Sequence, residues 1–406
     1  MDWPVQRRFR AITMMPFMAL RLFLVAPIAL LTDVKPHGDG LVAFGFIREL
    51  AARGHDLQVA AHRVDLRDEL PPNVELHVLD PRGAPAPLDR LGFMWRLRRL
   101  YRRLERRAPF AAVHQLNPVD VGLSLALTDL RAPLVLGPYV PDWPGFPKPG
   151  GRLARPAVVR VNRMIRAAQQ RRATTLLLST PAAASRLAID PSPGVHVREI
   201  SPGIDDRAWV PGGETAGQDV LFLANLEVRK GIHLALDAFE RLVPRLPGAR
   251  LIVAGRGPEL EAVQRRIRST PALERVELLG HLPREQVMAR MQNSDVYCLP
   301  SYDEPFGMTA LEAMACAKPV VATAAGGLAH LVPDEGGRKV PPGDPAALAD
   351  ALHEVLANPQ LRQAMGRHNR QVVEQRYAWA RVVDRLEEAY EEAMRDPRRA
   401  GSVKSR

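Results

Sequence analysis

The sequence predicts an α/β protein made of two doubly wound domains that face each other across a cleft. Two observations support this fold class. Short apolar runs alternate with helix-forming stretches along most of the 406 residues, a pattern typical of parallel sheets covered by helices. The polar stretch 211–218 interrupts the alternation, so the chain divides into two halves, each long enough to bury its own core.

The first half begins with an apolar run at 21–27, which we predict to be the first buried strand of a parallel sheet. The turn His37-Gly38-Asp39-Gly40 follows, and Gly54 ends the helix expected after it, over 41–53. Further strands are expected over 55–61, 74–79, 111–116, 134–137, 175–179 and 195–200.

The second half repeats the alternation of strands and helices. Strands are expected over 220–224, 250–254, 276–279, 296–300 and 319–323. Helices are expected over 232–246, 259–269, 284–294, 345–357 and 377–395.

The chain thus divides into four predicted parts. These are a disordered basic extension at 1–17, a first domain at 18–210, a second domain at 218–375, and a last helix with a basic tail at 376–406. The first strand makes Met18 an alternative start. Arg21 and two prolines within 11–31 argue against a membrane span there.

Charge and cysteine content narrow the partners and the compartment. The net charge of +11 points to anionic membranes or nucleic acid, and no nucleic-acid-binding motif accompanies it, so we expect no nucleic-acid partner. Cys298 and Cys316 both lie in apolar surroundings, which predicts small core residues in a reducing compartment and no disulfide or metal framework.

Two stretches, 88–107 and 152–172, predict basic helices. Helical spacing in the first places Leu91, Met94, Leu97, Leu100, Tyr101 and Leu104 on an apolar side, with Phe93 and Trp95 beside it. Such a helix suits the surface of an anionic bilayer, and it equally suits a domain helix whose arginines face solvent. Both interpretations stay open.

The most informative stretch follows the strand at 296–300. Glu304 precedes a helix that begins near Gly307, and Glu312 lies more than a turn into that helix. The free amides of Gly307, Met308 and Thr309 at the helix start can face a diphosphate, and glycine lets the backbone approach it. The two carboxylates would reach different parts of one nucleotide-sugar ligand.

This segment, Glu304-Pro305-Phe306-Gly307 through Glu312-Ala313-Met314-Ala315, resembles the E-x7-E motif of retaining family-4 glycosyltransferases with the GT-B fold. The resemblance implies that Glu304 contacts the donor sugar, that Glu312 binds the ribose, and that the stretch from Phe306 to Thr309 holds the diphosphate. It also implies two facing Rossmann-like domains and a C-terminal helix that crosses back to the first.

A second element of the predicted site is Arg229-Lys230-Gly231, which follows the first strand of the second half and precedes a helix. The resemblance implies that Lys230 contacts the diphosphate. Many relatives carry Gly-Arg where this chain has Ala224-Asn225, so a phosphate-neutralising cation is missing. We expect Arg229 to compensate by turning inward.

The first half matches the family more loosely. Gly38 and Gly40 match a glycine-rich loop that approaches the donor. His114 lies in a stretch similar to the family's His-x-His-x-Pro, with Leu116 in place of the second histidine, and it is either a catalytic contact or a buried strand-end histidine. Tyr139 and Trp143 are candidate acceptor contacts or residues of a self-packed loop.

These features predict a retaining transferase that moves a hexose-type sugar from a nucleotide-sugar donor to a glycan, glycolipid or small hydroxylated acceptor. The alternatives are a non-catalytic nucleotide-sugar or anionic-lipid binder and a nucleotide-sugar epimerase. No cofactor is expected, and no metal site either, since the chain contains no Asp-x-Asp. We expect a cytoplasmic location, with contact to the inner face of the cell membrane left open.

Overall fold

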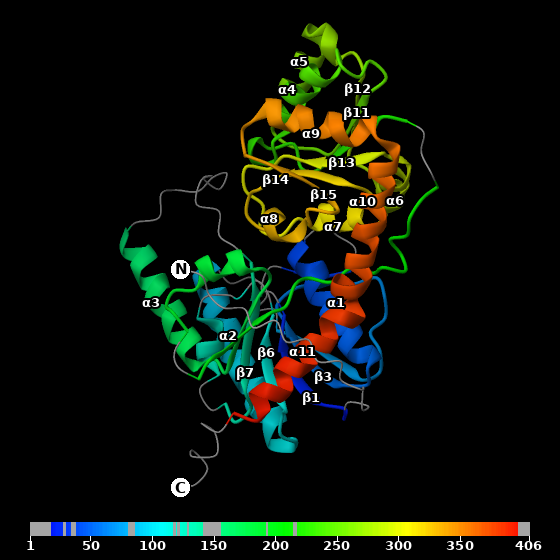
Figure 1. Ribbon diagram of the computed structural model, residues 1–406. Helices are drawn as coiled ribbons and strands as arrows, with labels where there is room; N and C mark the ends of the chain where they lie inside the picture. The colour runs from blue at the N-terminus through cyan, green and yellow to red at the C-terminus, as the bar shows by residue number, and fades with distance from the viewer. Residues whose placement is uncertain are drawn as a thin grey trace.

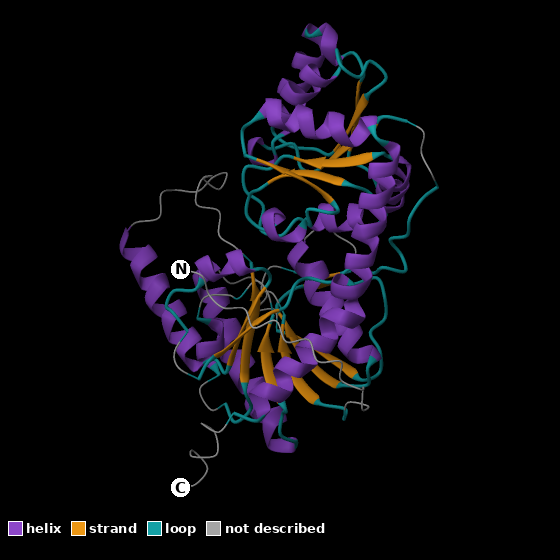
Figure 2. Ribbon diagram, viewed as in Figure 1, coloured by secondary structure: helices purple, strands orange, loops and turns teal. Residues whose placement is uncertain are grey.

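The computed structural model describes residues 18–396 except 27–29, 34–37, 80–85, 117–118, 120–121, 128–129, 141–155, 192–193 and 214–216. Two parallel sheets with helices on both faces form two domains, as Figure 2 shows with the strands in orange. This confirms the predicted fold class. The predicted extension at 1–17 and Trp143 lie outside the described residues.

The first domain holds a seven-stranded sheet in the order β5-β3-β1-β6-β7-β8-β9. Its strands are β1 Arg21–Val25, β3 Asp56–Ala61, β5 Val74–Val78, β6 Ala112–Gln115, β7 Leu134–Tyr139, β8 Thr175–Leu178 and β9 His196–Glu199. A separate pair, β2 Leu31–Thr32 and β4 Val64–Asp65, lies beside it. The order reverses between β1 and β6, as in a doubly wound fold.

Helices cover both faces of this first sheet. One face packs against α1 Gly38–Ala52 and against α11 Trp379–Met394, which arrives from the end of the chain. The other face packs against α2 Ala86–Arg107 and the 3-10 turn η1 Leu123–Ala126. The remaining elements of this domain are α3 Pro156–Arg172 and η2 Pro181–Arg186.

The second domain holds a six-stranded sheet in the order β12-β11-β10-β13-β14-β15. Its strands are β10 Asp219–Leu223, β11 Arg250–Ala254, β12 Val276–Gly280, β13 Val296–Leu299, β14 Val320–Thr323 and β15 Gly337–Val340. Its helices are α4 Ile232–Leu242, α5 Leu260–Ser269, α6 Arg284–Asn293, α7 Met308–Ala315, α8 Leu328–Leu331, α9 Pro345–Ala357 and α10 Pro359–Val372. The short turns are η3 Val228–Lys230, η4 Pro271–Leu273 and the π-helical η5 Val373–Tyr377.

The helices of the second domain also divide between two faces. The helices α4, α5 and α9 bury one face of the sheet, and α6, α7 and α8 bury the other. Figure 1 shows α7 and α8 on the side that faces the first domain. Met308, the first residue of α7, packs against the cores of both domains. The helix that carries the predicted donor motif therefore begins at the domain interface.

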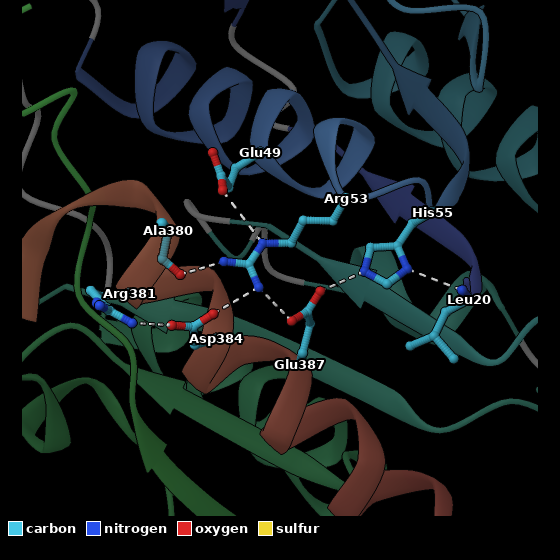
Figure 3. A network of polar contacts seen from close by, with 8 residues as sticks. All are labelled: Leu20, Glu49, Arg53, His55, Ala380, Arg381, Asp384 and Glu387. Carbon is cyan, nitrogen blue, oxygen red and sulfur yellow. Dashed lines mark hydrogen bonds and ion pairs between the residues drawn. The ribbon is translucent and has the colours of Figure 1, made fainter. Parts of the chain in front are cut away.

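The C-terminal helix crosses back to the first domain, as the resemblance implied. Figure 1 shows the chain leaving the second domain through α10 and running along the first domain as α11, beside α1. Arg53 Nη1 donates to Glu387 Oε2 of α11 at 2.6 Å, and it lies 2.8 Å from Asp384 Oδ1. His55 Nδ1 accepts from the Leu20 amide at 3.0 Å, so His55 Nε2 donates to Glu387 Oε1 at 2.8 Å (Figure 3). Glu387 thus ties α11 to the turn between α1 and β3.

The structure corrects the predicted stripe of the first basic helix. Among residues 91–107 of α2, the buried ones are Phe93, Leu97, Leu100, Tyr101 and Leu104. Leu91, which was predicted on the apolar side, is 61% exposed, and Trp95 is 62% exposed. The buried stripe follows Phe93 because that side chain reaches His62 and the sheet behind it. Among the described residues, no helix is long and apolar enough to cross a membrane.

Candidate active site

The predicted donor residues meet where the strand order of the second sheet reverses. Strands β10 and β13 are neighbours at this point, and the chain leaves them toward α4 and α7 respectively. Loops at the carboxyl ends of such strands form the ligand crevice of doubly wound sheets. Lys230 ends the first loop, and Glu304 lies in the second.

The two loops are held together by backbone contacts. Gly231 has φ +75°, and a Cβ placed on it would lie 1.9 Å from the carbonyl oxygen of Pro300, so only glycine fits. The amide of Tyr302 donates to the carbonyl of Arg229 at 2.9 Å. The positions of Lys230 and Glu304 are thereby fixed relative to each other.

Lys230 and Glu304 form an ion pair through Lys230 Nζ and Glu304 Oε2. Glu304 is only 6% exposed, and its backbone carbonyl accepts from the Gly327 amide at 2.6 Å. Because the carboxylate neutralises the ammonium, an incoming diphosphate would compete with Glu304 for the same cation. Such a competition frees Glu304 to accept hydrogen bonds from a sugar.

The helix α7 presents its N-terminus to the same place. Gly307 is the N-cap with φ +96°, and no side chain caps the helix, so its first amides have no acceptor within the helix. Tyr297 Oη, buried in β13, lies 2.6 Å from Thr309 Oγ1 and 3.0 Å from the carbonyl of Leu223. Tyr297 therefore orients the Thr309 hydroxyl. The apolar strand pattern gave no signal of this role.

Glu312 lies one turn further along α7. Burial raises the pKa of its carboxyl group to about 7, and the nearby charge of Arg284 on α6 opposes that shift. A carboxylate that costs free energy to ionise is stabilised by ligand hydroxyl groups that donate to it. The position suits the ribose contact that the resemblance implies.

Two other predicted donor residues are placed differently from expectation. The Phe306 side chain is buried against Tyr377, with ring centroids 6.1 Å apart, so it supports the loop and offers no side chain to a ligand. Arg229 Nε donates to Glu227 Oε2 at 2.7 Å within its own loop. Arg229 also acts on Asp303 through its charge. Burial and the charge of Glu304 raise the pKa of the Asp303 carboxyl group, and the positive charge of Arg229 lowers it. The compensating role of Arg229 stays a prediction.

The structure does not place the predicted His114 as a catalytic group. His114 is fully buried, its Nδ1 lies 2.6 Å from Tyr390 Oη of α11, and its Nε2 lies 3.0 Å from the carbonyl of Gly137. Burial lowers its pKa to about 4, so the ring is neutral near pH 7. The catalytic prediction is wrong for this geometry, because both ring nitrogens are occupied by the protein.

The other first-domain predictions also need correction. Gly38 and Gly40 lie in the first turn of α1 and not in a loop, and a Cβ on Gly40 would lie 2.5 Å from the carbonyl of Leu30. Close packing of α1 therefore accounts for Gly40, and the donor contact of Gly38 and Gly40 stays a prediction. Tyr139 lies inside β7 and is buried in the core of the first domain, so its ring is not available to an acceptor.

Gly326 and Gly327 are required by close packing beside Glu304. Gly326 has φ +54°, and a Cβ on it would lie 2.3 Å from the carbonyl of Glu304. A Cβ on Gly327 would lie 2.3 Å from the carbonyl of Pro305. These glycines let the loop before α8 pack against the loop that carries Glu304.

Among the described residues, no group of three or more His, Cys, Asp or Glu side chains is arranged to hold a metal ion.

Comparison with known proteins places this geometry in a family. A model described as Glycosyltransferase Family 4 matches residues 38–207, and a model described as Glycosyl transferases group 1 matches residues 211–372. Glycogen synthase of Mycobacterium tuberculosis is 33% identical over 211 residues, which are 51% of this chain and 51% of that protein. Phosphatidyl-myo-inositol mannosyltransferase of Mycobacterium leprae is 35% identical over 201 residues, 49% of this chain and 52% of that protein. The chain thus spans about half the length of the curated relatives it matches.

Solved structures share the whole architecture. Sucrose-phosphate synthase from Thermosynechococcus elongatus has a TM-score of 0.69 at 20% identity and covers 92% of this chain and 98% of its own. Anabaena Alr3699/HepE in complex with UDP has a TM-score of 0.68 at 19% identity and covers 92% and 100%. At these identities the likeness concerns the fold.

Proposed function

We propose that this chain, which belongs to the family-4 glycosyltransferases with the GT-B fold, is a retaining hexosyltransferase. Its donor would be a nucleotide sugar. The observation that carries the proposal is the meeting of Lys230, Glu304 and the uncapped start of α7 at the switch point of the second sheet. A cation and free amides favour a diphosphate, and a carboxylate beside them favours sugar hydroxyl groups.

The residues divide the proposed reaction between them. The bond between the anomeric carbon and the diphosphate oxygen breaks, and the acceptor oxygen bonds to the same face of that carbon, so the configuration is retained. The acceptor proton passes to the departing phosphate oxygen. Lys230 and the amides of Met308 and Thr309 stabilise the negative charge that grows on the diphosphate. Glu304 and Glu312 hold the sugar and the ribose.

Relatives support the donor class and the range of acceptors. The HepE structures are complexes with UDP and with UDP-glucose, which favours a UDP-sugar as the first donor to test. Curated relatives are named glycogen synthase, phosphatidyl-myo-inositol mannosyltransferase and D-inositol 3-phosphate glycosyltransferase. We propose a glycan, glycolipid or small hydroxylated acceptor accordingly.

Donor hydrolysis and binding across UDP-, GDP- and ADP-sugars test this function. The native chain should bind one donor class and hydrolyse it slowly without acceptor, and Glu304→Ala should lose both activities. Binding of a nucleotide sugar without turnover across an acceptor panel would favour the non-catalytic binder, an alternative motivated by the exposed Asn225 in place of a cation. Retention is checked by the anomeric configuration of the product.

Glu312 predicts a pH dependence of donor binding. Its pKa of about 7 exceeds the ordinary 4.5, so in the free protein its contribution to stability is present below pH 4.5 and is lost as the pH rises through 7. Ribose hydroxyl groups donate to the ionised form, so donor affinity should rise about tenfold between pH 6 and pH 8. Calorimetric titration with an intact nucleotide sugar, whose esterified phosphates do not titrate there, measures this rise.

Two variants separate this effect from other titrations. Glu312→Gln should bind donor with a flat pH profile, whereas Glu354→Gln, on α9 and paired with Arg338, should keep the native profile. An equal rise in affinity in Glu312→Gln would assign the dependence to another group.

We further propose that the outward face of α2 contacts an anionic membrane. A cavity of about 800 Å³ on this face is lined by Trp95 and Leu100 and by six arginines, Arg96, Arg98, Arg99, Arg102, Arg103 and Arg106. Leu91 and Trp95 are exposed beside them, and the Arg99 guanidinium lies 5.4 Å from the Trp95 ring centroid. Exposed aromatic and aliphatic groups among arginines suit the headgroup region of an anionic bilayer.

Vesicle sedimentation tests the membrane proposal. The native chain should sediment with vesicles that contain phosphatidylglycerol and not with phosphatidylcholine alone, and salt should weaken the binding. The double variant Arg99→Glu/Arg103→Glu should lose sedimentation. The matched variant Arg265→Glu/Arg268→Glu, on the exposed face of α5, should retain it. Equal loss in both variants would show that net charge alone drives binding and would contradict a docking role for α2.

A further inference from the structure

A second cavity lies at the opposite ends of the strands of the second sheet from the donor site. Its volume is about 320 Å³, and its charged lining residues are Asp295, Lys318, Arg362 and Arg367. Asp295 directly precedes β13 and Lys318 closely precedes β14, so the cavity lies at the amino-terminal ends of these strands. The donor residues lie at their carboxyl ends. An occupant of this cavity would not overlap the donor.

Lys318 is the unusual residue of this cavity. It is only 7% exposed, yet its ammonium group makes no hydrogen bond or ion pair with any residue that the structure describes. Burial lowers its pKa below the ordinary value, and the charge of Asp295 opposes that shift. The Lys318 side chain is largely removed from water and its ammonium group has no hydrogen-bond partner in the part of the chain that the structure describes, and an anion in the cavity would supply that partner.

Lys318 lines the cavity, and its backbone is fixed by hydrogen bonds. Its amide donates to the carbonyl of Ala313 at 3.0 Å, and its carbonyl accepts from Asn369 Nδ2 at 2.8 Å. Asn369 Nδ2 also donates to the carbonyl of Gly336 at 2.7 Å. The site is therefore built into the packing between α7, β14 and α10.

Some of the other charged groups of the cavity already bind protein groups, and one has no partner among the described residues. Asp295 Oδ2 accepts from the amide of Asp219 at 2.8 Å, and Arg362 Nη2 lies 3.8 Å from Asp295 Oδ1. Arg362 Nη1 also donates to the carbonyl of Leu356. Arg367 is exposed and has no hydrogen bond or ion pair with a described residue. The cavity thus offers two available cations, Lys318 and Arg367.

We propose that this cavity binds a small molecule that carries a phosphate group, at a site separate from the donor site. Two cations on different elements can contact different oxygens of one tetrahedral phosphate, and Arg367 can make two parallel bonds to it. Pro211, Pro319, Pro359 and Ala317 supply apolar walls for the body of the molecule. The volume fits the lower end of small-molecule sites.

Thermal unfolding of the full chain with inorganic phosphate tests this site. Against chloride at equal ionic strength, phosphate should raise the melting temperature of the native chain by about 2–4 °C. Lys318→Met should lose this difference and should be at least as stable as the native chain in chloride, because the unpaired charge is gone. Lys339→Met, a lysine paired with Asp334 in the same domain, should keep the phosphate response and measures the general effect of the salt.

Further variants separate this site from the donor site. Arg367→Met changes an exposed residue, so it should fold normally and show a weakened phosphate response. Lys230→Ala should keep the phosphate response. The native chain saturated with donor should still show a higher melting temperature in phosphate than in chloride. An unchanged response in Lys318→Met, or its loss in Lys230→Ala, would place the phosphate elsewhere and overturn the proposal, whatever the outcome for glycosyl transfer.

Discussion

Lys230→Ala is expected to lower turnover about 10²- to 10³-fold, because one preorganised cation beside a leaving group supplies stabilisation of that size. The structure places Lys230 Nζ against Glu304, just before the start of α4. The loss should appear in kcat as well as in donor affinity, since the charge on the diphosphate grows in the transition state.

Steady-state kinetics with the donor selected from the panel measures this loss. Lys339→Ala is the matched control, because Lys339 forms an ion pair with Asp334 away from the switch point. Removing Lys230 leaves Glu304 buried without its partner, so thermal unfolding must accompany the kinetics. A folded Lys230→Ala chain with turnover within threefold of native would remove Lys230 from the proposed chemistry, because a threefold change corresponds to only ~0.7 kcal/mol of transition-state stabilisation.

Glu387→Ala is expected to destabilise the first domain by about 1–3 kcal/mol, because it leaves the buried His55 Nε2 without an acceptor and removes one of the carboxylates that bind Arg53. Glu387 is 1% exposed and accepts from both Arg53 and His55, which lie on either side of the turn that ends α1. The resulting protein should unfold at a markedly lower urea concentration. Loosening of α11 would also disturb Tyr390, which contacts His114 in the first sheet.

Glu391→Ala provides the control for this helix. Glu391 lies one turn further along α11 and pairs with the exposed Arg395, so its loss should change stability by less than about 1 kcal/mol. Glu387→Gln keeps the shape and should have an intermediate effect. Equal urea midpoints for Glu387→Ala and Glu391→Ala would show that the network of Figure 3 does not hold the crossing helix.

Strands were the most predictable part of this fold. Parallel strands are buried on both faces, so they appear in the sequence as uninterrupted apolar runs, and the strand predicted over 250–254 coincides with β11 Arg250–Ala254. The arginine-rich helices α2 and α3 were also predicted, whereas α10 Pro359–Val372 was not. The start of α1 was also missed, because Gly38 and Gly40 suggested a turn where the structure has a helix.

Some site residues were likewise predictable from the local sequence, and others depend on contacts between residues far apart in the chain. Lys230 and Glu304 follow neighbouring strands, so their meeting at one edge followed from topology. The misassignment of His114 came from a contact that no local pattern shows, since its partner Tyr390 lies 276 residues further along the chain. Tyr297 was missed because a buried strand tyrosine looks like any core residue until Thr309 is placed beside it.

The central claim is that a nucleotide-sugar diphosphate binds at the switch point between β10 and β13. A crystal structure with the donor nucleotide diphosphate selected by the panel tests it most directly. We predict phosphate oxygens within hydrogen-bonding distance of the Met308 and Thr309 amides, Lys230 Nζ turned from Glu304 toward the phosphates, and the ribose on Glu312. A diphosphate bound elsewhere, with the Lys230–Glu304 pair intact, would contradict the account.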